Sequence, residues 1–341
     1  MHPARHCLRS SFYFFALAVL AVWLFLSPRG QTQSCQTSSD LDDATRTAVT
    51  NAGQRYFDMA VKGDSAGMRQ NAVPSLASDF SGIEGAVKDH QNDLAGAKPT
   101  LKSLFLLTVE GTGPLAHGEF YCGVFGKNGQ TAKSAVFYRD NLQPGEYGVV
   151  LFDVATAKQR TNFSLILERE GNDWKLGGLW ITPGAIGGHD SDWYATQARD
   201  FKSKAQIHNA WFYYLKAREL ASPLDFMYTA ATDTLFDEVH GVVPTDIPAN
   251  GKPSDLVAGG TTYKLTSLFP QAVGDDLDLV VKYSVPDASN TNQAYQSNLA
   301  VIQALVARFP EIKGAFAGVV ARAVDANGRD YGTLLAMKDI K

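Results

Sequence analysis

Hydrophobic residues recur at helical spacing in the first hundred residues of the chain. Between residues 40 and 62, alanines and larger apolar side chains follow a period of about 3.6 residues, and Gly63 ends the pattern. The same spacing predicts a short helix over residues 65–71 and a longer one from residue 81 to about 94, with Pro74 between them. We therefore expect three helices before the first strand.

The period changes to that of strands from residue 101 onward. Five or six strands are expected, and the runs that predict them are residues 101–110, 119–125, 134–139, 147–154, 162–170 and 174–181. Asn128-Gly129 and Gly171-Asn172 predict tight turns between neighbouring strands. Helices followed by antiparallel strands predict an α+β fold in which the helices pack on one face of a curved sheet.

Two short motifs add a family resemblance to this pattern. The sheet ends in the hairpin EREGNDWKLGGLWI, residues 168–181, and Gly63-Asp64 follows the first helix. With the order of three helices before the sheet, these motifs resemble the NTF2-like (SnoaL-like, cystatin-like α+β) superfamily over residues 41–183. The resemblance implies a cone-shaped pocket between sheet and helices, and the superfamily includes enzymes, binding proteins and dimerisation modules. The residues expected to line this pocket are Tyr56, Phe120, Tyr121, Trp174 and Trp180.

The second half of the chain begins after a glycine-rich stretch, residues 184–191, which we interpret as a linker. Aromatic residues are concentrated over residues 192–221, where their spacing predicts one long helix that Ser222-Pro223 ends. A second helix from there to about Val239 would complete a helical hairpin.

Prolines and glycines over residues 242–260 predict an extended loop after the hairpin. The elements expected next are strands over residues 261–269 and 278–285, a helix over 290–309, and strands over 315–324 and 331–337. The helical hairpin and this ββαββ order predict a second α+β domain over residues 192–341, in which we recognise no family.

Residues 1–30 have the pattern of an export signal. Arg5 and Arg9 precede an unbroken apolar run of 15 residues from Phe12 to Leu26, whereas a bilayer-spanning helix needs about 20. A cleaved signal peptide is therefore favoured over an N-terminal membrane anchor. In either case the rest of the chain would be exported to the periplasm or cell envelope and would touch the membrane only through this segment.

Two cysteines lie beyond residue 30. Cys35 belongs to a polar lead-in, residues 31–40, that we expect to be mobile, and Cys122 lies in an apolar strand. An oxidising compartment would permit a disulfide that closes a loop of roughly 87 residues, and two free thiols are the alternative. A cut before Cys35 would make a lipoprotein, but the preceding Thr-Gln-Ser lacks the residues of such signals. No Cys or His cluster has the spacing of metal ligands, so no metal site is expected.

Charge and missing motifs exclude several classes of function. The net charge is −4, and it would be −7 without residues 1–30, which hold three arginines and no acid. Nucleic-acid binding needs clustered Lys and Arg, so no nucleic-acid partner is expected. The sequence also lacks the Gly-x-Ser-x-Gly elbow, the phosphate-binding Gly-Lys-Ser/Thr loop and the His-Glu-x-x-His helix, which argues against common hydrolases, nucleotide-dependent enzymes and zinc proteases.

Two polar motifs have both a functional and a structural interpretation. His189, Asp190 and Asp192 could form a metal or acid–base cluster, but we prefer Asp190 or Asp192 as the cap of the next helix. Residues 325–330 superficially resemble a calcium loop, but a hairpin turn at Asn327-Gly328 explains them better.

We therefore expect a non-enzymatic protein that binds a small apolar ligand or a protein partner in the cell envelope, without a cofactor and without a catalytic residue. One alternative is an isomerase or hydrolase that uses the NTF2-like pocket, with Tyr56, Asp58, His117 and Tyr121 as acid–base candidates. The other is a scaffold or homodimer that associates through the open sheet face, with residues 193–240 as a docking surface. A filled pocket together with an exposed apolar patch would favour this last hypothesis.

Overall fold

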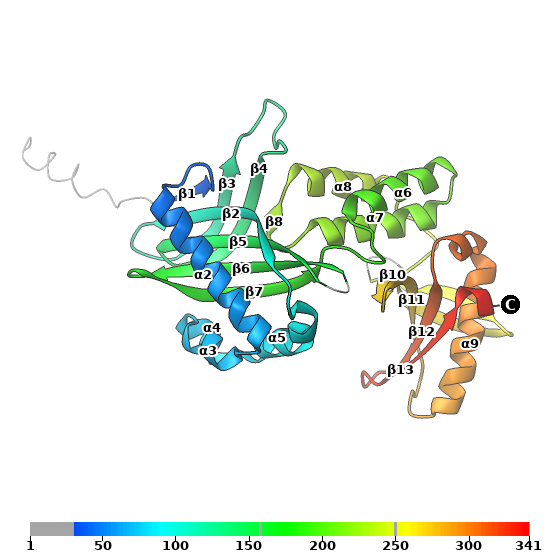
Figure 1. Ribbon diagram of the computed structural model, residues 1–341. Coiled ribbons are helices and arrows are strands. Elements are labelled where there is room, and N and C mark those ends of the chain that lie inside the picture. Colours follow the sequence, from blue (N-terminus) through cyan, green and yellow to red (C-terminus); the bar gives the residue numbers. More distant parts are fainter. Residues whose placement is uncertain (1–30, 157–158, 249–250, 341) are drawn as a thin grey trace, which may run out of the picture.

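The computed structural model describes residues 31–156, 159–248 and 251–340. Within these ranges, eight α-helices and three largely antiparallel β-sheets form the α+β fold that the sequence predicts. Figure 1 shows the elements between residues 32 and 183 on one side of the molecule and those between residues 254 and 339 on the other. Helices α6 to α8 lie above and between these two groups.

The first sheet has five antiparallel strands in the order β1-β2-β5-β6-β7. Their bounds are Thr32–Thr37, Pro99–Glu110, Gly145–Ala155, Arg160–Glu170 and Asp173–Pro183. Four helices separate β1 from β2 in the chain, and they are α2 (Asp43–Lys62), α3 (Ser65–Gln70), α4 (Pro74–Ser78) and α5 (Ser81–Leu94). Helix α2 packs across β2, β5, β6 and β7, and Figure 1 shows it lying over one face of the sheet.

Helix α2 ends at the residue that the sequence predicts and begins a few residues after the expected start at residue 40. Asp42 caps its start and accepts a hydrogen bond from the backbone N–H of Thr45, and Gly63 ends it in the left-handed conformation with φ 68°. The face toward the sheet buries Tyr56 and Phe57. Burying an aromatic side chain of this size stabilises the fold by about 1.5–3 kcal/mol, so this face holds the helix on the sheet.

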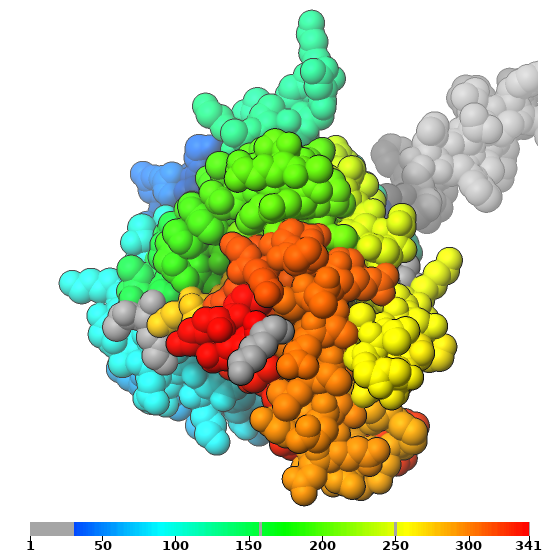
Figure 2. Space-filling view, turned by 90° about the vertical axis from the view of Figure 1, so that its right-hand side faces the viewer, coloured from blue at the N-terminus to red at the C-terminus, as the bar shows by residue number. Residues whose placement is uncertain are grey.

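A second, smaller sheet covers the opposite face of the first. Its strands are β3 (Leu115–Gly123), β4 (Ser134–Leu142) and β8 (Met227–Tyr228), in the antiparallel order β3-β4-β8. Its inward side chains share one buried core with the first sheet, including Phe120, Cys122, Phe137, Leu107, Val149 and Leu151. Figures 1 and 2 show the hairpin of β3 and β4 projecting beyond the neighbouring elements.

This hairpin turns where the sequence predicts. The backbone N–H of Gly126 donates to the carbonyl of Gly129 at 2.9 Å, and the reverse bond measures 3.2 Å. Gly129 has a φ of 100°, whereas Asn128 is not among the residues with positive φ. The turn therefore uses the conformational freedom of one residue, and not of both as a two-residue Asn-Gly turn would.

Residues 32–37 form strand β1 and not the mobile lead-in that we expected. They pair with β2 along their whole length, and the sulfurs of Cys35 and Cys122 form a disulfide with a Cα–Cα distance of 5.0 Å. The side chain of Gln33 also accepts from the backbone N–H of Glu119 at 3.2 Å and donates to its carbonyl at 2.8 Å. These bonds join β1 to β3 and tie the first sheet to the second.

The helical part of the second half differs from the expected hairpin. The single helix predicted over residues 192–221 is wrong, because the chain forms α6 (Ser191–Ser203) and α7 (Ile207–Ala221) instead. The break falls at Ala205, whose φ of 58° is incompatible with a continuing helix. The second predicted helix begins later than expected, as α8 (Ala230–His240), because Met227 and Tyr228 pair with β4.

The C-terminal sheet has one strand more than the predicted ββαββ order. Its strands are β9 (Ser254–Ala258), β10 (Thr261–Val273), β11 (Asp276–Ser284), β12 (Gly318–Val324) and β13 (Asp330–Ala336), in the order β13-β12-β11-β10-β9. Strand β9 lies within the segment expected as a loop. Strands β11 and β12 are parallel and are connected through α9 (Thr291–Arg308) and the 3₁₀ turn η1 (Pro310–Gly314). One buried core joins this sheet, α9 and the helices α6 to α8, and Figure 2 shows these helices above the sheet.

Among the residues that the structure describes, no helix has the length and apolar content needed to cross a bilayer. The signal peptide or membrane anchor expected over residues 1–30 lies outside the described ranges.

Candidate functional site

Two of the five residues expected to line a pocket, Tyr56 and Trp174, lie in the core between α2 and the first sheet. Tyr56 is fully buried, and its hydroxyl donates to the carbonyl oxygens of Asn71 at 2.8 Å and Trp174 at 3.1 Å. Phe57 and Phe163 pack edge to face in the same core, with 5.1 Å between ring centroids. Buried side chains thus occupy the interface in which the family resemblance implied a cone-shaped pocket.

The other three residues lie on the opposite side of the first sheet. Phe120 is fully buried between the two sheets. Trp180 packs against the same core and meets Phe226 edge to face at 5.5 Å. Tyr121 follows Phe120 in β3, points outward and is 56% exposed. The five residues therefore do not line one common pocket.

The acid–base candidates are also separated in the structure. Asp58 lies on the exposed surface of α2 and accepts a hydrogen bond from Gln54 at 2.9 Å. His117 lies in β3 and pairs with Asp140 of β4 at 2.9 Å, and both side chains are exposed. Neither pair reaches the buried hydroxyl of Tyr56, so these groups do not converge on one point.

The two polar motifs serve local structure. Asp190 caps α6 and accepts from the backbone N–H of Trp193 at 3.1 Å, while the His189 ring stacks on that indole at 3.7 Å. Asp325 lies in the turn between β12 and β13 and accepts from the backbone N–H of Asn327 and the side chain of Arg329, each at 2.8 Å. Both arrangements agree with the structural interpretations that we preferred.

A row of aromatic residues lies on the outer face of the second sheet. We call it the tyrosine face, and its members are Tyr121, Phe125, Tyr138 and Tyr228. Tyr121 meets Phe125 edge to face at 5.7 Å, and Tyr138 meets Tyr228 in the same way at 5.3 Å. Tyr138 is 45% exposed. The tyrosine face therefore presents large aromatic side chains to solvent.

The alternation of the strands produces this face. Phe137 is opposite Met227, and both point inward to the core between the sheets. Val136 is opposite Tyr121 on one side and Tyr228 on the other, so these three side chains point outward. Because opposite and diagonal neighbours on one sheet face are close in space, the tyrosines form a continuous row.

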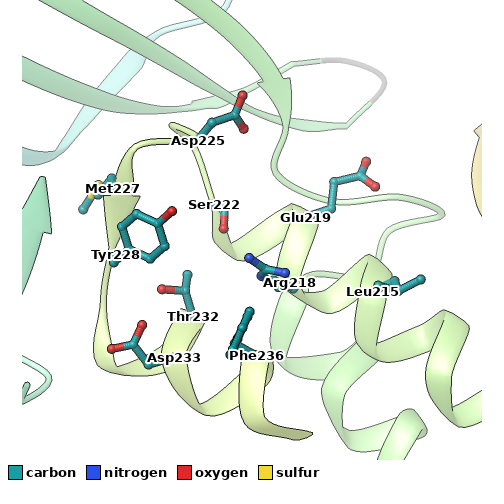
Figure 3. Close-up of a pocket in the computed structure, with 10 residues that line it drawn as sticks. All are labelled: Leu215, Arg218, Glu219, Ser222, Asp225, Met227, Tyr228, Thr232, Asp233 and Phe236. Carbon is teal, nitrogen blue, oxygen red and sulfur yellow. The ribbon is translucent and has the colours of Figure 1, made fainter. Parts of the chain in front are cut away.

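A hollow of about 410 Å³ adjoins the tyrosine face at Tyr228. It lies between α7, β8 and α8, and its apolar lining comes from Leu215, Met227 and Phe236. Figure 3 shows the guanidinium of Arg218 between Ser222 and the ring of Phe236, and its Cζ lies 5.0 Å from the centroid of that ring. Phe236 itself is 44% exposed, so the hollow is open to solvent along α8.

Carboxylates border both the hollow and the tyrosine face. Asp225 and Asp233 line the hollow, and Glu119 accepts from the hydroxyl of Tyr121 at 2.8 Å. Asp233 accepts from the side chain of Gln130 at 2.6 Å, which joins the β3–β4 loop to α8. Across the described ranges, none of the three carboxylates has an ion-pair partner. The surface is therefore acidic as well as aromatic.

The same surroundings keep the exposed phenols protonated. The hydrogen bond to Glu119, and then its charge, raise the pKa of Tyr121 above its usual value. Partial burial, and then the charge of Glu119, raise the pKa of Tyr138. Both hydroxyls remain hydrogen-bond donors at neutral pH.

Tyr121 is the one member of this surface among the residues predicted from the sequence. The strand period around Phe137 could have placed Tyr138 on the solvent side, because it puts successive residues on opposite faces. No comparable signal exists for Tyr228, which pairs with β4 from a segment that we expected to be helical.

Comparison with protein-family models, with curated proteins and with solved structures found no match.

Proposed function

We propose that this chain is a binding protein whose tyrosine face and adjoining hollow receive a lysine- or arginine-bearing segment of a partner protein. The observation that carries the proposal is the continuity of exposed phenols, an apolar hollow and unpaired carboxylates around Tyr228. Aromatic residues dominate the binding energy of protein interfaces, because they bury much area and lose little conformational entropy. Exposed rings held by a sheet are already ordered before a partner binds.

The charge of this surface indicates the chemistry of the partner. Asp225, Asp233 and Glu119 lie on or beside it without ion-pair partners in the described part of the chain, whereas Arg218 is the cation of the hollow's lining. A partner with lysines or arginines would offset these carboxylates and speed the encounter. The cations of such a partner could also form cation–π contacts with the faces of the tyrosine rings.

The hypothesis of a small apolar ligand held between α2 and the first sheet receives less support. Tyr56, Phe57 and Phe163 fill that interface with side chains that are at most 1% exposed. The hypothesis of an enzyme that uses the same interface receives less support for the same reason. The arrangement favours the protein-partner version of our expectation, which the sequence alone left open.

We also propose that residues 1–30 direct export, which would place the tyrosine face in the periplasm or cell envelope. The disulfide between Cys35 and Cys122 supports this location, because such bonds persist in oxidising compartments. Membership of residues 41–183 in the NTF2-like superfamily remains part of the proposal. Its support is the group of helices from α2 to α5 that precedes β2, β5, β6 and β7 of the first sheet.

Site-specific photo-crosslinking in the native host tests the proposed function. A photoreactive phenylalanine analogue replaces Tyr138 in the full-length chain, and the control carries it at Val257, which is 66% exposed on strand β9. We expect a discrete crosslinked species from position 138 that is absent from position 257. Mass spectrometry of that species then identifies whether the captured segment is basic.

The charge of the partner gives a second measurement. The double variant Asp225→Asn/Asp233→Asn should reduce the crosslinked fraction at position 138 several-fold, because it removes the carboxylates that we assign to cation recognition. Equal crosslinking at positions 138 and 257, or an acidic captured segment, would contradict the proposal.

A further inference from the structure

A second hollow, of about 640 Å³, lies between the two sheets of the first half of the chain. Its walls come from segments far apart in the sequence, namely residues 37–40, 102–105, 123–124 and 132–135. Met227 and Thr229 close it on the side of β8. This hollow is separate from the tyrosine face, so a role for it does not depend on the proposed function.

Cations outnumber acids around this hollow. Lys102, Lys133 and Arg46 line it, and Asp40 is the acid among its lining residues. The carboxylate of Asp40 already accepts from the backbone N–H and the hydroxyl of Thr37, at 2.8 and 2.6 Å. The lining of this hollow is therefore positively charged, although the chain as a whole has a net charge of −4.

The two lysines are available for a ligand. Arg46 pairs with Asp43 and donates to the carbonyl of Ser38 at 3.0 Å, so its charge is partly offset. Lys102 and Lys133 have no ion-pair partner within the described ranges. Both ammonium groups can therefore bind an anion without breaking an existing ion pair.

Strand β2 contains a β-bulge at Lys102. The pairing of β2 with β5 shifts register between Leu101 and Ser103, so Lys102 is the extra residue of a β-bulge. Bulges are frequent next to binding sites, where they redirect a side chain out of the regular alternation. Here the bulge lies at the wall of the hollow and is followed by Ser103, a second lining residue.

The floor of the hollow is apolar, and its rim carries hydroxyl groups. Phe105 and Met227 are each less than 10% exposed, belong to the core between the two sheets and form part of the lining. Ser103 and Thr229 are hydroxyl residues of the rim. A ligand that suits this lining carries negative charge at one end and apolar surface at the other.

The disulfide holds two of these walls in place. Thr37 follows Cys35 by two residues, and Gly123 directly follows Cys122. The bridge therefore fixes the distance between the β1 wall and the β3 wall before any ligand arrives. Such preorganisation reduces the entropic cost of binding.

We propose that this hollow binds a small organic anion. Lys102 and Lys133 hold its carboxylate or phosphate group, and its apolar body rests on Phe105 and Met227.

Isothermal titration calorimetry of the full chain at low ionic strength tests this site. The probes are inorganic phosphate, hexanoate and hexyl phosphate. We expect hexyl phosphate to bind more tightly than inorganic phosphate, because only the alkyl chain uses the apolar floor. Binding of hexanoate as well as hexyl phosphate would assign the site to oxyanions in general, and binding of hexyl phosphate without hexanoate would assign it to phosphates.

Matched charge variants separate a built site from general attraction. In Lys102→Gln/Lys133→Gln the dissociation constant of hexyl phosphate should rise about tenfold or more, since two charge-assisted contacts are lost. The control Lys252→Gln/Lys313→Gln removes the same charge from exposed positions outside the hollow and should change it by less than about twofold. An equal rise in both variants, equal affinity for phosphate with and without the alkyl chain, or no binding by any probe would overturn the proposal.

Discussion

The disulfide between β1 and β3 makes the most direct test of the first half of the fold. It links residues 87 positions apart, and in the chain-entropy relation a loop of this size contributes about 4.6 kcal/mol at 25 °C. The ladder between β1 and β2 remains in its absence, so the variant Cys35→Ala/Cys122→Ala should still fold. Alanine is preferable to serine because Cys122 is fully buried, where a hydroxyl would need a partner.

Urea unfolding followed by circular dichroism measures the loss. We expect the free energy of unfolding of the oxidised protein to be about 3–5 kcal/mol higher than that of the double variant, and its melting temperature to be higher by roughly 10 °C. A reductant should bring the wild-type protein close to the double variant and should leave the double variant unchanged. Unfolding midpoints that coincide for the oxidised protein and the double variant, or a non-reduced peptide map without the linked peptides, would refute this reasoning.

Three further predictions concern stability. Burial raises the pKa of Tyr147 and of Tyr194 to about 12, while an unfolded phenol titrates near 10. The contribution of the two protonated phenols to the free energy of unfolding is therefore complete below about pH 10 and is lost as the pH rises toward 12. The urea midpoint should fall over that range, and a constant midpoint would contradict this expectation. Asp190→Ala removes the cap of α6 and should cost about 1 kcal/mol in urea unfolding, whereas Asp192→Ala in the same turn should cost less than half of that. Asn298→Ala removes the acceptor of a buried tyrosine hydroxyl, at 2.8 Å, and should lower the free energy of unfolding by about 2–3 kcal/mol; a loss below 0.5 kcal/mol would show that water replaces the amide.

Sequence reasoning succeeded where structure is decided by neighbouring residues. Gly63 ends α2 as predicted, because a glycine readily takes the left-handed conformation that ends a helix, whereas the residue that caps its start, Asp42, lies two positions after the expected beginning at residue 40. The turn of the β3–β4 hairpin follows from Asn128-Gly129 in the same way. Asp190, one of the two caps that the sequence offers, directly precedes a run with helical spacing and caps α6.

The failures concern residues whose conformation is decided by distant partners. Ala205 takes a left-handed conformation that no local signal marks, and the predicted long helix breaks there. Tyr228 became a strand residue because β4 offers it an unpaired edge. The polar segment around Cys35 became β1 because β2 and the disulfide hold it, although its composition is typical of loops.

The proposed binding surfaces both arise from those distant pairings, which is why the sequence could not locate them. The tyrosine face exists because β8 extends the sheet of β3 and β4 and sets Tyr228 beside Tyr138. The second hollow, lined by Lys102 and Lys133, lies where the disulfide joins β1 to β3 and brings residues 37–40 close to residues 123–124. Met227 lines both hollows, so the short strand β8 forms a shared wall.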